Sequence, residues 1–188
     1  PTATFTPSLT PTETLTPTLT YTPTATFTPI VTDAPPGGID LPPDNIIYTL
    51  SDGSSLTLGM TIIVNGHAGP DLVLYERVNG SGINMDMIQL LISQDGHTWY
   101  NVFYWGDGAA DTHSNLNIAG SLGGTEFDDR DISASYLYPT GTYGDAGVTM
   151  DLDMVVPAGT YNYLRIYAPD PGAGFDNICD IDSIQILP

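Results

Sequence analysis

Short runs of apolar and β-branched residues alternate with Gly- and Asp-rich turns from residue 44 to the end of the chain. The runs, among them SLTLGMTIIV, DLVLYERV, TWYNVFYW and TYNYLRIYA, are rich in the residue types that favour strands. No stretch of about ten residues has a helical period that is free of Gly and Pro. Many short strands at this spacing predict an all-β sandwich or barrel, with about eight to ten strands.

The period of two within these runs indicates which residues face the core. Alternate side chains of a strand lie on opposite sides of the sheet, and one side is buried. The residues predicted to form the core are Leu72, Leu74, Ile88, Leu90, Leu164, Ile166, Ile184 and Ile186.

The first 29 residues follow a different pattern, in which every even position from 2 to 28 holds Thr, except for Ser8. Because an extended chain places alternate residues on opposite sides, this segment should be a ribbon with one hydroxyl face and one apolar face. All of its Pro residues lie on the apolar face. The large apolar residues of that face, which we predict to make assembly contacts, are Phe5, Leu9, Leu15, Leu19, Tyr21 and Phe27.

The composition divides the chain into an extended Thr/Pro arm (1–33), a Pro/Gly hinge (34–43) and a β-sandwich domain (44–188). Fully extended, the arm would reach ~95 Å at ~3.3 Å per residue, whereas the domain is only ~30 Å across. An arm of that length can lie along neighbouring copies of the chain, which favours a filament. A solvated stalk without a partner is the alternative.

The hydroxyl face of the arm suits dense O-glycosylation. The residues expected to carry covalent glycans are Thr4, Thr6, Thr10, Thr12, Thr14, Thr16, Thr18, Thr20, Thr22, Thr24, Thr26 and Thr28. Asn79 begins an N-glycosylation sequon, and the Asn-Gly pair there also predicts a tight hairpin turn after DLVLYERV.

The charge of the chain is one-sided, with 22 acidic residues against Arg77, Arg130 and Arg165 and no Lys. A net charge of −19 argues against nucleic acids and anionic membranes as partners. No run is long and apolar enough to predict a membrane span, and the composition indicates an extracellular or cell-surface protein. Cys179 is expected to be a small buried residue rather than a nucleophile.

Three pieces of the domain resemble jelly-roll modules of the galactose-binding-like, carbohydrate-binding type. They are GPDLVLYE (69–76), LISQDGHTWYNV (91–102), and YNYLRIYAPD with FDNICDIDSIQIL (161–187). With its arm, the chain also looks like bacterial exported surface proteins and subunits of glycan-coated extracellular fibrils. The resemblance implies a single antiparallel jelly-roll β-sandwich.

In such modules a terminal Asp often helps to bind a structural Ca²⁺, and the resemblance assigns this role to Asp182, with Asp180 and Asp176 nearby. The Glu usual near the start of these modules has no clear counterpart in IIYTLSDGSS. Hard cations prefer several carboxylate oxygens, and other clusters also offer them, although solvated turn and edge residues are the favoured explanation of any one cluster. These clusters are Asp128/Asp129/Asp131, Asp145/Asp151/Asp153 and Asp107/Asp111.

Aromatic residues in TWYNVFYW offer a sugar-binding surface, with Trp99 and Trp105 as the candidate residues. The two indoles share a face only if the strand stays regular, and a core position is the alternative.

No motif predicts catalysis. There is no GxSxG, the three His residues lie in polar loop-like stretches, and no carboxylate pair stands out as that of a glycosidase. The sequence therefore predicts a structural subunit of an extracellular glycosylated filament, in which the arm docks on neighbouring copies. The alternative is a carbohydrate-binding module on a glycosylated stalk of a larger surface protein.

Overall fold

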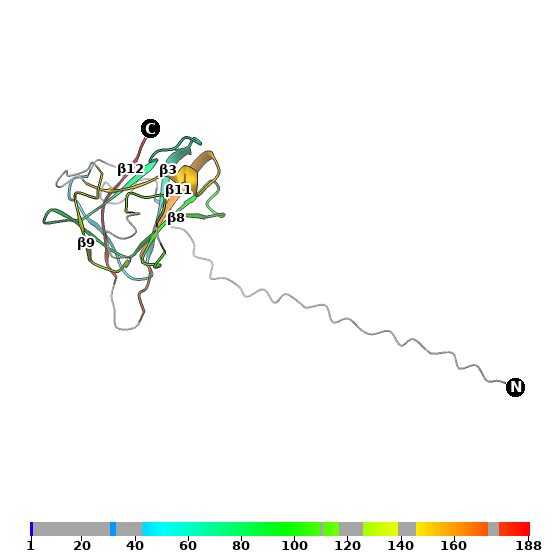
Figure 1. Cartoon of the computed structure of the whole chain (residues 1–188), viewed down its shortest axis with the longest axis horizontal. Helices are drawn as coiled ribbons and strands as arrows, with labels where there is room; N and C mark the ends of the chain where they lie inside the picture. Colours follow the sequence, from blue (N-terminus) through cyan, green and yellow to red (C-terminus); the bar gives the residue numbers. More distant parts are fainter. Residues whose placement is uncertain (2–30, 33–42, 110, 117–125, 139–145, 173–176) are drawn as a thin grey trace.

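The structure is a computed structural model that describes residues 1, 31–32, 43–109, 111–116, 126–138, 146–172 and 177–188. This part contains twelve strands and a single-turn 3₁₀ helix, η2 (Leu152–Met154). A five-stranded and a four-stranded sheet form the two layers of a β-sandwich, and a three-stranded sheet lies at its side (Figure 1). The predicted all-β sandwich is confirmed. Within these residues, no helix is long and apolar enough to cross a membrane.

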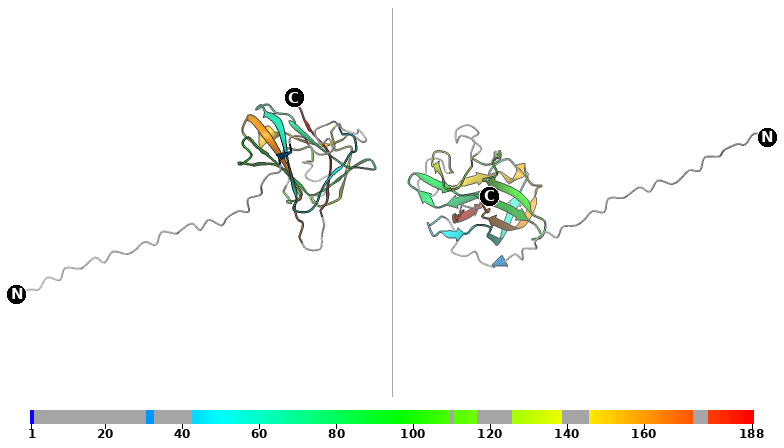
Figure 2. Two further views of the ribbon diagram at one scale, coloured as in Figure 1. Left: turned by 180° about the vertical axis from the view of Figure 1, so that it is seen from behind. Right: turned by 90° about the horizontal axis from the view of Figure 1, so that it is seen from below.

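The larger sheet has the strand order β1-β3-β11-β7-β8. Its strands are β1 (Val31–Thr32), β3 (Ser55–Val64), β11 (Gly159–Tyr167), β7 (Ile88–Ser93) and β8 (Tyr100–Trp105). The views of Figure 2 show β3 in cyan beside β11 in orange, and these two strands pair along most of their length.

All pairs in the larger sheet are antiparallel except β1 with β3, which is parallel and sets Val31 opposite Thr57. The predicted antiparallel sandwich is therefore confirmed, with one short parallel pair at this edge. Residues 31–32, at the end of the predicted arm, pair with the sandwich of their own chain.

The smaller layer has the order β10-β4-β12-β2, and the side sheet has the order β5-β6-β9. The strands of the smaller layer are β10 (Val148–Met150), β4 (Leu72–Glu76), β12 (Cys179–Ile186) and β2 (Tyr48–Leu50). Those of the side sheet are β5 (Val78–Asn79), β6 (Gly82–Met85) and β9 (Arg130–Ser133). The run INMDMIQLLIS is thus two strands in different sheets, and VTMDLDMVV is β10 followed by η2.

The core lies between the two main sheets and includes the residues that the period of two selects. Leu72, Leu74, Ile88, Leu90, Leu164, Ile166 and Ile184 are at most 1% exposed, and Ile186 is partly buried against them. Burying each such side chain contributes ~1.5–3 kcal/mol relative to leaving it in water. The predicted core is confirmed.

The predicted hairpin turn after DLVLYERV is also present. Asn79 pairs with Gly82, so the two-residue loop is Gly80-Ser81, one position later than the Asn-Gly pair predicts. Gly80 has φ +57°, which a residue without a side chain adopts most easily.

Gly82 lies where β6 pairs closely with β9. A Cβ added there would lie 1.8 Å from the carbonyl oxygen of Ile132. Because that oxygen belongs to the paired backbone, the strands would have to separate, and Gly82→Ala should lower the free energy of unfolding by about 1–3 kcal/mol. Gly59→Ala in β3 is the control, since nothing lies within 4 Å of its added Cβ. Urea denaturation measures both, and equal losses would contradict the described pairing.

Candidate functional site

The outer face of the five-stranded sheet has a row of polar and aromatic side chains from β11. The β3–β11 register shifts between Tyr161 and Tyr163. Tyr161 is 1% exposed in the core, whereas Tyr163, Arg165 and Tyr167 are partly exposed on the other side. In a regular strand Tyr161 and Tyr163 would share a face, so the shift is what places Tyr161 in the core and not in the outer row.

The neighbouring strands extend this row into a surface. Arg165 lies opposite Thr57 of β3 and Leu91 of β7, and Tyr167 lies opposite Ser55 and Gln89 of the same two strands. Tyr104 of β8 is the cross-strand partner of Gln89. Burial raises the pKa of the Tyr104 phenol, with smaller contributions from Asp107 and Tyr167. These side chains therefore form one continuous polar-aromatic patch.

The two candidate Trp residues separate to opposite sides of the sheet. The β7–β8 register shifts between Leu90 and Leu91, which interrupts the alternation along β8. Trp105 is 2% exposed, and its indole N–H donates to the carbonyl of Phe127 at 3.2 Å. Its rings are covered, so the prediction of a sugar contact at Trp105 is corrected to a core role. Trp99 is partly exposed and belongs to the outer surface.

Trp99 stacks on Arg165. The guanidinium carbon lies 3.9 Å from the centre of the Trp99 ring, and the Arg165 Nε–H donates to Thr57 Oγ1 at 3.4 Å. A cation over an indole face contributes ~0.5–2 kcal/mol. The stack therefore fixes both side chains in one arrangement. We call Trp99, Tyr163, Arg165, Tyr167 and Gln89 the outer-face site.

The turn that precedes β8 holds Trp99 in place. Asp95 Oδ1 accepts the backbone N–H groups of His97 and Thr98, both at 2.8 Å. These bonds, with that from Thr98 the strongest, lower the pKa of the Asp95 carboxyl to about 2. The Trp99 indole N–H donates to the Gly96 carbonyl at 3.2 Å. The turn is thus a hydrogen-bonded unit that ends in the exposed Trp.

Contacts with β11 fasten the same turn to the sheet. Asn162 Nδ2 donates to the Gln94 carbonyl at 2.9 Å. A Cβ at Gly96, which has φ +73°, would lie 3.5 Å from the Tyr163 ring. The outer-face site is therefore pre-formed, which lowers the entropy cost of binding a ligand.

A shallow cavity of about 170 Å³ opens beside Arg165. It is lined by Gly53, Ser55, Gln89, Leu91, Arg165 and Tyr167, from β3, its preceding turn, β7 and β11. Pockets for drug-sized ligands measure ~300–1,000 Å³, so this one suits a single small ring with polar substituents. Ring faces lie next to groups that donate and accept hydrogen bonds, an arrangement that could bind a sugar.

Tyr163, Arg165 and Tyr167 were not among the predicted site residues. The alternation in YNYLRIY was the available signal, because it places these three residues on one face whatever the fold. Because Leu164 and Ile166 are predicted core residues, the same alternation indicates that this face is the outer one, and the register shift removes only Tyr161 from it.

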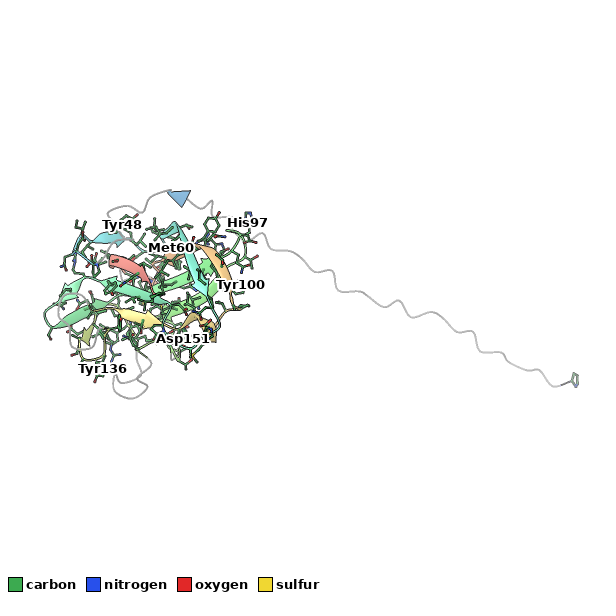
Figure 3. The ribbon with its side chains drawn as sticks, turned by 90° about the horizontal axis from the view of Figure 1, so that it is seen from above. Tyr48, Met60, His97, Tyr100, Tyr136 and Asp151 are labelled. Atoms are coloured by element: carbon green, nitrogen blue, oxygen red, sulfur yellow. The ribbon has the colours of Figure 1, made fainter. Side chains whose placement is uncertain are left out.

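Three carboxylates form the best-assembled candidate cation site in the described part of the chain. Oxygens of Asp71, Asp151 and Asp153 lie within 4.8 Å of one another. Asp71 is 5% exposed, and its pKa is raised by burial first and then by Asp153 and Asp151. Asp151 (Figure 3) follows β10 of the smaller layer, whereas the outer-face site lies on the five-stranded sheet, so this acidic triad and the outer-face site are separate.

Each carboxylate of the acidic triad has one oxygen held by a backbone N–H. The donors are Leu152 to Asp71 at 2.8 Å, Gly69 to Asp151 at 3.1 Å and Gly66 to Asp153 at 2.7 Å. Asp151 Oδ1 and Asp153 Oδ2 are buried atoms without a hydrogen-bond partner among the described residues. Since unpaired buried oxygens are costly, a Ca²⁺ ion, which takes oxygen ligands, would satisfy both.

The triad differs from the cluster predicted around Asp151 and Asp153. Asp145 lies outside the described residues, and Asp71 takes part instead. Asp151 and Asp153 do not lie on one strand, because β10 ends at Met150 and η2 follows it. Asp71 was missed because it lies about 80 residues away in sequence.

The residues predicted by resemblance to bind Ca²⁺ have other partners in the structure. Asp182 is 2% exposed and accepts the backbone N–H groups of Asp44 and Asn45 at 3.2 and 3.0 Å. Asp180 forms an ion pair with Arg77 at 2.8 Å and accepts the Thr49 hydroxyl at 3.0 Å. Asp176 lies outside the described residues. Calcium binding by this group stays a prediction.

Two further acidic groups are buried with like charges beside them. Burial raises the pKa of Asp111 to about 7, and the nearby charge of Glu126 adds to the shift. Glu126 therefore belongs with the predicted pair Asp107/Asp111. Burial also raises the pKa of Asp86 to about 7, and raises that of Glu76 well above its usual range. Glu76 Oε1 has no hydrogen-bond partner among the described residues.

The cluster Asp128/Asp129/Asp131 lies next to Glu76 and Asp86. Asp128 and Asp129 line an open cleft of about 370 Å³ together with Arg77 and Asp180. Asp131 instead accepts the Asn79 side-chain N–H at 2.9 Å. The three residues therefore do not act as one group.

The remaining candidate side chains have structural roles or lie outside the described part. Cys179 is buried and burial raises its pKa, as expected of a core thiol. His113 Nε2 bonds to the Val102 carbonyl. The predicted assembly residues and O-glycosylation sites of the arm lie outside the described residues. Asn79 is exposed at the hairpin, and its glycosylation stays a prediction.

Comparison with models of known protein families finds no match, and comparison with curated protein sequences finds none. Among solved structures, the chain is similar to a carbohydrate-binding module, CpGH89CBM32-5 from Clostridium perfringens, in complex with GalNAc-β-1,3-galactose. The two chains are 13% identical with a TM-score of 0.37, over 77% of this chain and 76% of that one. A likeness at this level says nothing about the ligand of this chain, and the sandwich rests on the strand pairing described above.

The acidic triad predicts a response to Ca²⁺. Adding Ca²⁺ to chelator-treated protein should raise the midpoint of thermal unfolding, because the ion binds only the folded triad. Asp153→Asn should remove most of this shift, since it replaces one unpaired oxygen. Asp170→Asn, an exposed turn residue that accepts the Gly172 N–H, is the control. An equal shift in both variants would contradict the site.

Asp86 predicts a pH dependence of stability. Its pKa of about 7 in the folded state lies above the ordinary 3.8, so the folded state binds more protons between these values. Stability is therefore fully present at low pH and is lost as the pH rises towards about 7. With a chelator present to remove metal ions, the free energy of unfolding of Asp86→Asn should exceed that of the parent by about 1–3 kcal/mol above neutral pH. At about pH 4 the two proteins should be equally stable, because Asp86 is then protonated in the folded state.

Urea denaturation across this pH range measures the effect. Asp95→Asn is the control, because Asp95, with a pKa of about 2, titrates in the folded state below the pH range in which Asp86 titrates. An unchanged pH slope in Asp86→Asn would rule out the assigned shift.

Proposed function

We propose that the chain is a non-catalytic carbohydrate-binding β-sandwich module, displayed outside the cell on its Thr/Pro arm. The observation that carries this proposal is the stack of Trp99 on Arg165 at 3.9 Å, flanked by partly exposed Tyr residues and a small cavity with a few polar groups in its lining. A sugar ring has apolar C–H faces and an equatorial rim of hydroxyls. The outer-face site offers aromatic faces for the first and Gln89, Ser55 and Arg165 for the second.

The chemistry of the lining favours binding over hydrolysis. The cavity beside Arg165 is lined by neutral side chains and one guanidinium, whereas a glycosidase needs a pair of carboxylates across its substrate. The same surface is rigid, because two strands and a hydrogen-bonded turn hold Trp99 and Tyr163. A pre-formed site of this kind binds without ordering loops.

The filament hypothesis depends mainly on arm residues outside the described part. The described end of the arm, β1, pairs within its own chain, and that contact does not favour assembly with other copies. Docking of the arm on neighbouring copies and O-glycosylation of its Thr residues therefore stay predictions, as does the extracellular location.

Glycan binding by the outer face is tested with Trp99→Ala. A glycan array should identify ligands for the full chain, and calorimetry should show at least about a tenfold loss of affinity in the variant, because the stacking face is gone. Tyr138→Ala is the matched control, since Tyr138 is 42% exposed and lies outside the outer-face site. Circular dichroism checks that both variants fold.

Two results would overturn the proposal. One is the absence of binding to any glycan on a broad array, and the other is a ligand whose affinity is unchanged by Trp99→Ala.

A further inference from the structure

We infer that the outer-face site selects sugars that carry a carboxylate, as uronic acids do, and that Arg165 binds this group. The inference rests on the proposed function and adds the class of ligand. It starts from the distribution of charge in the chain and from the surroundings of one guanidinium.

Arg165 is unusual among the three basic side chains of a chain with 22 acidic residues. Arg77 forms an ion pair with Asp180 at 2.8 Å. Arg130 lies between Asp129 and Asp131 in sequence, and its guanidinium carbon is 5.1 Å from the Phe127 ring centre. Within the described residues, Arg165 forms no ion pair and has no adjacent acidic residue in sequence. Arg165 is therefore kept apart from acidic side chains, although the chain is rich in them.

The environment of Arg165 disfavours an unpaired charge. Burial lowers the pKa of its guanidinium, and no carboxylate opposes that shift. Its Nε–H donates to Oγ1 of Thr57, and Thr57 is only 3% exposed. Among the described residues, no hydrogen bond occupies the terminal nitrogens of the guanidinium. A partly desolvated cation of this kind gains most from an anionic partner.

The geometry suits a carboxylate better than a lone hydroxyl. Stacking on Trp99 and the bond to Thr57 fix the plane of the guanidinium. A fixed planar fork matches the two oxygens of a carboxylate, which accept two parallel N–H groups. Gln89, Ser55 and Tyr167 line the cavity beside it and can bond to the hydroxyls of the same ring.

The net charge of the chain restricts how such a ligand is recognised. With −19 overall, the protein repels anions at long range, although salt screens this field beyond ~8 Å. Nonspecific attraction therefore cannot account for acidic-sugar binding, and only a local contact can. This makes the prediction specific to Arg165.

The test compares sugars that differ only at C6. Binding of methyl β-D-galacturonide and methyl β-D-galactoside, and of the corresponding glucuronide and glucoside, is titrated by NMR against the full chain at physiological salt. The uronide of at least one pair should bind about tenfold more tightly than its neutral partner. Arg165→Gln should bring that ratio close to one while the chain stays folded.

Two further variants identify the cause of the preference. Arg165→Lys keeps the charge but not the fork, so it should retain only part of the ratio. Arg130→Gln removes the same charge and a similar guanidinium–aromatic contact elsewhere, and should leave the ratio unchanged.

The outcomes separate this inference from the proposed function. Equal binding of uronide and neutral sugar, still sensitive to Trp99→Ala, overturns the acidic preference and leaves the module intact. Tighter binding of the matching 6-sulfate than of the uronide overturns the assignment to a carboxylate. No binding of any sugar overturns both.

Discussion

Burial of one face of each main sheet against the other fixes the direction of every side chain along its strands. Leu90 of β7 and Ile166 of β11 are fully buried, so their sequence neighbours Leu91 and Arg165 must lie outside. The composition of the outer face is therefore a consequence of how the core packs. A site on such a face is also rigid, because moving it would disturb the sandwich itself.

Two register shifts change this alternation at the positions that matter for the site. In β11 the shift puts Tyr161 in the core and Tyr163 outside, and in the β7–β8 pair it puts Trp105 in the core while Trp99 stays outside. β-Bulges commonly redirect a side chain in this way. The aromatic residues are thus shared between stability and surface recognition within two short strands.

The excess of acid is accommodated in different ways in different parts of the chain. Backbone N–H groups donate to the carboxylates of Asp95 and Asp182, and at Asp95 these bonds lower the pKa. Burial instead favours the protonated form of Glu76 and Asp86. The acidic triad has backbone donors for only part of its oxygens, as do Glu76 and Asp111, but only in the triad do three carboxylates of the described residues lie within 4.8 Å of one another. The number of Asp residues alone therefore identifies no metal site.

The sequence by itself determined the all-β class, the core residues and the burial of Cys179, because these depend on the local period of two and on residue type. Only the tertiary structure separated Trp105 from Trp99, brought Asp71 to Asp151 and Asp153, and placed Arg165 on Trp99. Those contacts join residues that are distant in sequence, and they depend on strand order and register shifts. Hydrogen bonding between strands determines the strand order and the register shifts, and a local sequence pattern does not predict this pairing.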